Sequence, residues 1–184
     1  PDLSVQSKEA DYSSNTVITI VYNSTATGTV NITLKGKNRN YTFEKELNAT
    51  ISLGDIDADE YEVNVIYSGD NVFWNATATG KLTINKANST LTINDNVTFD
   101  YNTNGSTTVS FTDAQGVVAE VVGQPNAIVV VNDTTITVSG LNAGTYTLTV
   151  TTITDANHNN VTKNATITVN KAKTQLTANA ITAT

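Results

Sequence analysis

Few residues of this chain have the chemistry of a catalytic site. His158 is the only histidine, and the chain contains no cysteine. A catalytic triad or a zinc site needs several partners around a histidine, so we interpret His158, in the polar stretch Asp155–Asn160, as a loop residue. A glycosidase needs two carboxylic acids, but acids are sparse and Glu120 is the one glutamate in residues 88–172. We therefore expect a protein that is not an enzyme.

One acidic cluster has the residue types of a calcium site; its members are Asp55, Asp57, Asp59 and Glu60. Carboxylate oxygens at alternate positions are typical calcium ligands, and the polar run 94–96 has a similar character. The cluster is not a property of the repeat described below, since Asn142 and Gly144 replace two of its acids. Two interpretations stay open: calcium, as the single cofactor considered, or a solvated acidic turn.

Trp74 is the sole tryptophan and a candidate ligand contact. It lies in the connection Ser68–Asn75, beside Asn and Asp residues. An exposed indole ring can stack on a sugar, or it can cover the edge of a sandwich and anchor the hairpin. Both interpretations stay open.

Covalent modification is predicted at two kinds of position. Lys8 and Asn85 are a conceivable pair for an intramolecular isopeptide bond. Asparagine glycosylation is expected in an extracellular protein at some of the Asn-x-Ser/Thr sequons, which begin at Asn23, Asn31, Asn40, Asn48, Asn75, Asn88, Asn96, Asn104, Asn132, Asn160 and Asn164.

The composition indicates all-β structure and excludes several functions. The 184 residues include 34 Thr and 24 Asn, which favour strands and turns respectively. The net charge is −7 without a basic cluster, so nucleic-acid binding is excluded. No apolar run approaches the roughly 20 residues that span a bilayer, so we expect no membrane insertion by this segment.

The chain contains an internal repeat. Residues 56–87 align without a gap on residues 141–172, and both segments end in Asn-Lys-Ala. We expect two domains, residues 1–87 and 88–172, followed by residues 173–184 as the opening strand of a third repeat. No Pro-, Gly- or Ser-rich linker separates the domains, which favours a stiff or semi-stiff rod whose repeats contact their neighbours.

Alternating apolar residues and frequent turns predict an immunoglobulin-like β-sandwich in each domain. About seven short strands per domain are typical of that fold. Tyr61 and Tyr146 each follow a short turn and open an alternating strand. They are predicted to be equivalent core residues that form a tyrosine corner, in which the hydroxyl group bonds to the backbone a few residues upstream.

The segments SGLNAGTYTLTV, DANHNNVTKNATITVNKA and IDADEYEVNVIYSGDN resemble the immunoglobulin-like repeats of methanogen (archaeal) adhesin-like surface proteins. The resemblance covers both domains. It implies an extracellular location on the cell surface and a stalk or spacer that presents a distal binding region for cell–cell or cell–surface attachment. The alternative is a binding module whose loops contact a glycan or a partner protein.

Overall fold

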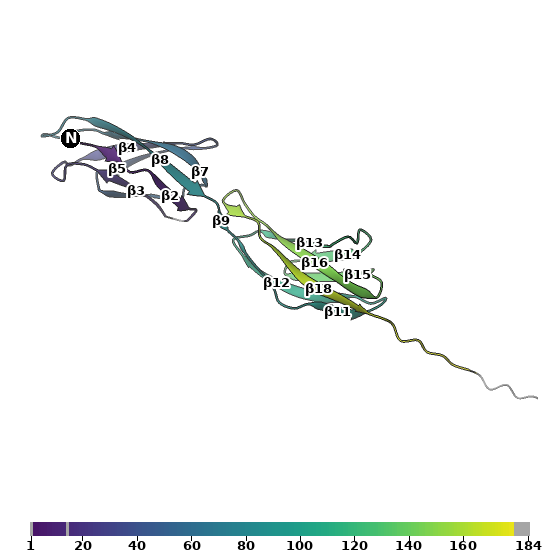
Figure 1. Ribbon diagram of the computed structural model, residues 1–184. Helices are drawn as coiled ribbons and strands as arrows, with labels where there is room; N and C mark the ends of the chain where they lie inside the picture. Colours follow the sequence, from purple (N-terminus) through teal and green to yellow (C-terminus); the bar gives the residue numbers. More distant parts are fainter. Residues whose placement is uncertain (1, 14, 179–184) are drawn as a thin grey trace, which may run out of the picture. The chain divides into compact units, whose positions relative to one another are not determined.

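The computed structural model describes residues 2–13 and 15–178 (Figure 1). In this part of the chain every regular element is a β-strand. Residues group into two compact units: Pro1–Asn88 with Asp155–Asn159, and Ser89–Thr154 with Asn160–Thr184. The 155–159 loop therefore belongs to the first unit, although the sequence repeat assigns it to the second domain.

The described residues of the first unit form two main sheets and one two-stranded sheet. One main sheet has the strand order β1-β3-β6 and the other β2-β8-β7-β4-β5. The strands are β1 (Ser4–Val5), β2 (Lys8–Asp11), β3 (Thr16–Val21), β4 (Thr29–Lys35), β5 (Asn40–Glu46), β6 (Thr50–Gly54), β7 (Asp59–Tyr67) and β8 (Ala76–Asn85). Two short strands, β9 (Ala87–Asn88) and β17 (His158–Asn159), pair in parallel within the same unit.

The second unit also contains two sheets, with the orders β10-β12-β15-β14 and β11-β18-β16-β13. Its strands are β10 (Thr90–Ile93), β11 (Val97–Asp100), β12 (Gly105–Thr112), β13 (Gly116–Val121), β14 (Ile128–Asn132), β15 (Thr135–Ser139), β16 (Gly144–Ile153) and β18 (Thr162–Asn170). In Figure 1, β11, β18 and β16 run side by side in this unit, as their hydrogen-bonded registers require.

The two strand orders are those of immunoglobulin-like sandwiches. In the usual strand letters, the second unit has sheets ABED and GFC, with β11 as an additional strand beside G. The all-β, immunoglobulin-like prediction is therefore confirmed. Among the described residues, no helix has the length and apolar character to span a bilayer.

The apolar faces expected from the alternation point into the cores. The buried side chains of the first unit include Val30, Ile32, Leu34, Val63, Val65 and Tyr67. Those of the second include Val97, Ile136, Val138, Leu148, Val150 and Ile167. Burial of these branched and aromatic side chains is the main term that stabilises each sandwich.

The units differ in the strand that follows strand C, which is β4 in the first unit and β13 in the second. In the first unit, β5 forms a hairpin with β4, closed by the Gly36 amide, which donates to the Arg39 carbonyl oxygen at 2.9 Å. In the second unit, β14 pairs instead with β15, on the other sheet. The chain between β13 and β14 contains Pro125, which has no amide hydrogen to donate to a ladder, and turns through Gly123 at a φ of 69°.

The opening strand predicted for a third repeat is only partly within the described residues. Residues 171–178 are in neither a strand nor a helix, and Leu176 is exposed. Residues 179–184 lie outside the described residues. A β-strand is defined by pairing with a neighbouring strand, so local sequence similarity to residues 88–93 is not sufficient to form one.

Candidate functional site

The two repeat-equivalent tyrosines make the same hydrogen bond. The Tyr61 hydroxyl donates to the Asp57 carbonyl oxygen at 2.8 Å, and the Tyr146 hydroxyl donates to the Asn142 carbonyl oxygen at 2.9 Å. Each bond reaches four residues upstream, as a tyrosine corner requires. Burial, and then the neighbouring Tyr41, raise the pKa of Tyr61 above its usual value.

The two rings differ in burial. Tyr61 is 2% exposed, whereas Tyr146 is half-buried. This difference in burial follows from the different sheets that β5 and β14 join. In the first unit, β5 carries Tyr41, whose ring packs edge-on against Tyr61 with centroids 5.9 Å apart. In the second unit the corresponding strand, β14, lies on the other sheet. Tyr61 and Tyr146 are therefore equivalent in hydrogen bonding but not in packing.

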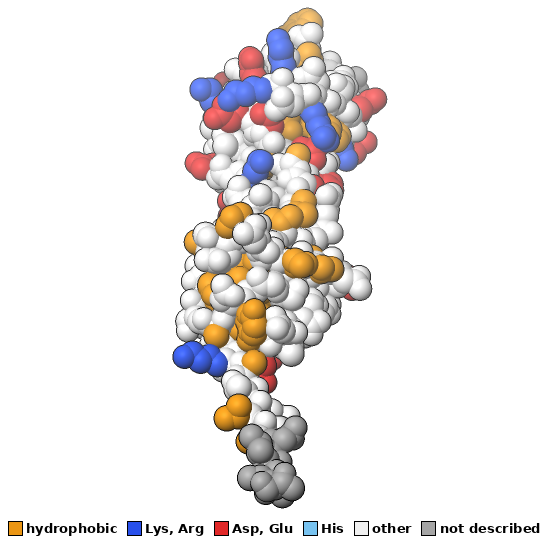
Figure 2. All heavy atoms as spheres, turned by 90° about the vertical axis from the view of Figure 1, so that its right-hand side faces the viewer, with side chains coloured by type: hydrophobic (Ala, Val, Ile, Leu, Met, Phe, Trp, Pro, Cys, Tyr) orange, Lys and Arg blue, Asp and Glu red, His pale blue; other side chains and the backbone are white. Residues whose placement is uncertain are grey.

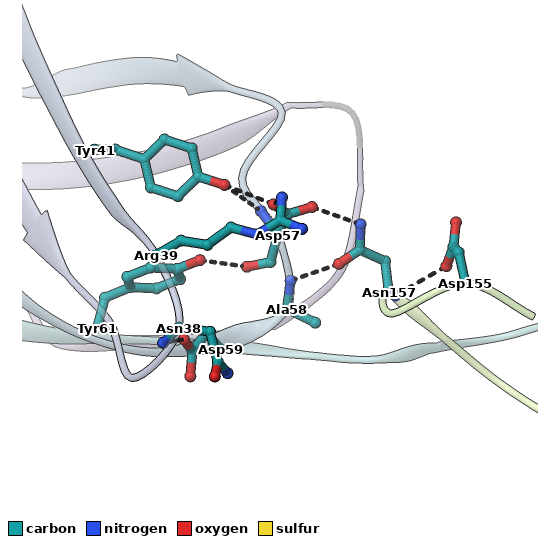
Figure 3. A network of polar contacts seen from close by, with 9 residues as sticks. All are labelled: Asn38, Arg39, Tyr41, Asp57, Ala58, Asp59, Tyr61, Asp155 and Asn157. Carbon is teal, nitrogen blue, oxygen red and sulfur yellow. Dashed lines mark hydrogen bonds and ion pairs between the residues drawn. The ribbon is translucent and has the colours of Figure 1, made fainter.

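Asp57 is the centre of a polar network in the first unit (Figure 3). Its carboxylate pairs with the Arg39 guanidinium and accepts hydrogen bonds from the Tyr41 hydroxyl at 2.8 Å and from Asn157 Nδ2 at 2.7 Å. The Ala58 amide donates to Asn157 Oδ1 at 2.9 Å. The side chain of Asn157 thus holds the 155–159 loop against the turn that precedes β7.

Asp59 and Glu60, two further acids of the predicted calcium cluster, also have partners within the chain. Asp59 accepts a hydrogen bond from the Asn38 amide at 3.0 Å, and Glu60 pairs with Lys37 at 2.7 Å. Burial raises the pKa of Asp59, but the amide donors of Asn38 and Glu60 outweigh it and hold that pKa below its usual value. No group of three or more potential ligands occurs among the described His, Asp and Glu residues. These partners favour the acidic turn over calcium, which stays an untested prediction.

Hydrogen bonds to the Asp70 carboxylate hold the loop that carries Trp74 in place. Asp70 accepts hydrogen bonds from the amides of Thr27, Val72 and Phe73, at 2.8, 2.7 and 2.7 Å. These donors, led by Thr27, hold the pKa of Asp70 well below its usual range. The tip of the loop is left outside, since Trp74 is 86% exposed and Val72 is 78% exposed. The indole ring does not cover the sandwich edge, so the loop presents an apolar surface on a stiff support.

Asp155 has the same role in the second copy of the repeat. It occupies the place of Asp70 in the aligned segments, and its Oδ1 accepts the Asn157 amide at 2.8 Å. His158 Nδ1 lies 2.7 Å from the same oxygen, and this contact holds the pKa of Asp155 below its usual value. The His158 ring also meets the Tyr12 ring edge-on, with centroids 5.3 Å apart. His158 is thus a structural part of the loop.

The sequon asparagines are all exposed, which satisfies the first requirement for glycosylation. The predicted isopeptide pair is not brought together. Lys8 lies beside Leu82 in the β2–β8 register and donates to the Val17 carbonyl oxygen at 3.2 Å. Asn85 lies three positions further along, or about 10 Å at the usual strand rise.

Two surface features were not predicted from the sequence. A groove of about 700 Å³ on the first unit is lined by residues of β4, the turn after β4, β7 and β8, among them Lys37 and Glu60, which pair with each other. In the second unit, Ile128 and Val130 on the edge strand β14 and Val118 on the edge strand β13 are exposed. The face of the molecule in Figure 2 shows charged side chains gathered on the first unit and mainly uncharged atoms on the second.

Sequence comparisons give no relative: no protein-family model and no curated protein matches the chain. Structural comparison finds sandwich proteins at low similarity. The fibronectin(III)-like modules of Clostridium thermocellum CbhA are 12% identical with a TM-score of 0.40, and the match covers 96% of each chain. The Drosophila N-cadherin fragment is 9% identical with a TM-score of 0.39, covering 93% of this chain and 65% of that one.

A third structure contains the first four immunoglobulin domains of Sidekick-1, at 11% identity and a TM-score of 0.38, covering 91% of this chain and 48% of that one. Identities this low concern the fold alone, and at these TM-scores the fold assignment depends on the strand order of the chain itself.

Proposed function

We propose that this chain is a structural spacer, a segment of an extracellular, cell-surface adhesin similar to those of methanogens. In this proposal the immunoglobulin-like repeats hold a distal binding region away from the cell, and neighbouring repeats are the main partners. The observation that supports the proposal is that polar side chains of the chain stabilise its own loops. Asp57, Asp70 and Asp155 each hold a loop of the sandwich in place, in a chain whose residues 56–87 align on residues 141–172 without a gap.

Small-angle scattering tests the spacer directly. A rod of two sandwiches should give an elongated particle, with a maximum dimension about twice that of a single domain. A compact particle would contradict the proposal. The profile should not change when calcium is replaced by a chelator, because Asp57, Asp59 and Glu60 are already partnered by Arg39, Asn38 and Lys37.

Glycosylation belongs to the same proposal. Glycans on the exposed sequons would shield the spacer from proteases, and mass spectrometry of the protein from its native host measures their occupancy at each site. If no asparagine is modified, the glycosylation part of the proposal is wrong, whereas the spacer function is not affected.

A binding module is the second candidate, favoured by the exposure of Trp74 on a loop that Asp70 holds rigid. Exposed aromatic rings on pre-organised loops give contact area at low entropic cost. A glycan array and a pull-down on cell-wall material are the tests. Saturable binding that is lost in Trp74→Ala and kept in Val118→Ala, a matched exposed apolar control on the second unit, would favour binding over spacing.

A further inference from the structure

The 155–159 loop contacts several residues of the first unit. The His158 ring meets Tyr12, and Asn157 Oδ1 accepts the Ala58 amide at 2.9 Å. The Ala87 amide donates to the Asn157 carbonyl oxygen at 3.0 Å, and Asn159 Nδ2 donates to the Lys86 carbonyl oxygen at 3.4 Å. The seat of the loop therefore includes Tyr12, Ala58, Lys86 and Ala87, together with Asp57 and Asn88, which bond to the side chains of Asn157 and Asn159.

The second unit has the first four of these residue types at the equivalent places. In the gapless alignment of the two repeats, Ala143, Lys171 and Ala172 stand opposite Ala58, Lys86 and Ala87. The fourth member is identified by backbone pairing. The Tyr12 amide donates to the Asn85 carbonyl oxygen at 2.8 Å, and the Tyr101 amide donates to the carbonyl oxygen of its counterpart Asn170 at 2.9 Å.

These four counterparts line a shallow depression of the surface. Tyr101, Ala143, Lys171 and Ala172 surround a volume of about 310 Å³, which we call the terminal pocket. All four are exposed, and Tyr101 is 41% exposed, whereas its counterpart Tyr12 is half-buried beside His158. The terminal pocket thus repeats four residue types of the seat and its tyrosine-to-asparagine backbone hydrogen bond, and it is open.

We propose that the terminal pocket is a docking site for a loop of the Asp155–Asn159 type, carried by a further immunoglobulin-like repeat. Tyr101 would receive the ring at the His158 position, and the amides of Ala143 and Ala172 would bind the asparagine at the Asn157 position. Asn142 replaces Asp57 here, and its side-chain oxygen can accept the Nδ2 hydrogen bond without a charge.

A second copy of this chain is a poorer occupant. Its exposed loop of the same kind, residues 70–74, has Val72 in place of Asn157 and Phe73 in place of His158. A valine side chain cannot accept from the Ala143 amide or donate to Asn142. The terminal pocket should therefore bind a loop with asparagine at this position. The residue at this position of the loop would determine which repeats can dock.

The inference rests on the proposed function only in that it takes another repeat as the partner. The experiment extends the chain by joining a second copy of residues 88–184 after Ala172. Amide hydrogen exchange followed by NMR then compares Ala143 and Ala172 in the extended and unmodified chains. Docking should slow exchange at both amides by at least about tenfold. Asn→Ala at the appended counterpart of position 157 should restore fast exchange at Ala143.

A second probe does not depend on folding of the extended chain. A hairpin peptide with the sequence of residues 150–163, closed by a disulfide between two cysteines added at its ends, is titrated into the unmodified chain, with the Asn157→Ala peptide as control. Docking predicts saturable shifts of the Ala143 and Ala172 amide signals with the first peptide and none with the second. Unchanged exchange in a folded extended chain, or absence of peptide-induced shifts if that chain does not fold, would overturn the proposal.

Protection of the same amides in the unmodified chain at high concentration would also overturn it, because the occupant would then be a second copy. A compact scattering profile, by contrast, would contradict the spacer function, but the amide measurements would still decide whether a loop docks in the terminal pocket.

Discussion

The two tyrosine corners share a hydrogen bond and differ in packing, so their substitutions should differ in cost. Tyr61→Ala removes a buried ring and should lower the free energy of unfolding of the first unit by about 3–5 kcal/mol. Tyr146→Ala should cost less, since that ring is half-buried. Tyr→Phe at either position should cost about 0.5–1.5 kcal/mol, the usual contribution of one hydrogen bond.

Denaturant unfolding of the whole chain, with a separate spectroscopic probe in each unit, measures these costs. An unchanged midpoint for Tyr61→Ala would show that the ring is not part of the core. Equal costs for the two alanine variants would contradict the role of Tyr41.

Asp70 gives the first unit a predictable response to acid. Its pKa is lowered in the folded state by the amides of Thr27, Phe73 and Val72, so its charged form stabilises the fold above the unfolded pKa near 4. That contribution is lost progressively as the pH falls below about 4. Asp70→Asn should therefore be less stable than the parent at pH 7, with a difference that shrinks on acidification. Thermal unfolding between pH 7 and 2 checks this, and a constant difference would contradict it.

At the level of elements, the edge strands of the second unit carry apolar side chains outward. Ile128 and Val130 lie on the outer face of β14, and Val131 points inward to the core. Ile128→Lys with Val130→Lys should change the free energy of unfolding by no more than about 0.5 kcal/mol, because surface changes are usually small. The same variant should associate less, because charges on an edge strand discourage pairing between molecules.

Light scattering at increasing concentration, together with urea unfolding, separates the two effects. Val131→Lys is the control, since a lysine directed at the core should destabilise the unit strongly. An outer-face variant as unstable as this control would show that the alternation of β14 is misassigned.

For the molecule as a whole, Asn157 lies in the second sequence repeat but belongs to the first compact unit. Asn157→Ala removes the bridge between the Asp57 carboxylate and the Ala58 amide. Loss of such a partner costs about 1–3 kcal/mol, and the cost should appear in the unfolding of the first unit. The probes of the first unit described above measure it, with Asn164→Ala on β18 as the control. A loss confined to the second unit would contradict the assignment.

Features that depend on neighbours along the chain could be predicted from the residues alone. Alternation set which side chains face the cores, as for Val30, Ile32 and Leu34, and the turn before Tyr61 set its hydrogen bond four residues upstream. The gapless repeat identified equivalent positions such as Asp70 and Asp155, whose loops are capped in the same way. These features are local, so the pattern of residue types is sufficient to predict them.

Contacts between residues far apart in the chain depended on the folded arrangement. Asp57 and Asn157 are 100 residues apart, and no local pattern specifies that they share a hydrogen bond. The edge strand after strand C is β5 in the first unit and β14 in the second. It joins one sheet in the first unit and the other sheet in the second, because its backbone can pair with either neighbour. The sheet that this edge strand joins decides whether one of its side chains, such as Tyr41 on β5, packs against the tyrosine corner. The terminal pocket likewise exists only because the folded strands bring Tyr101, Ala143 and Ala172 together.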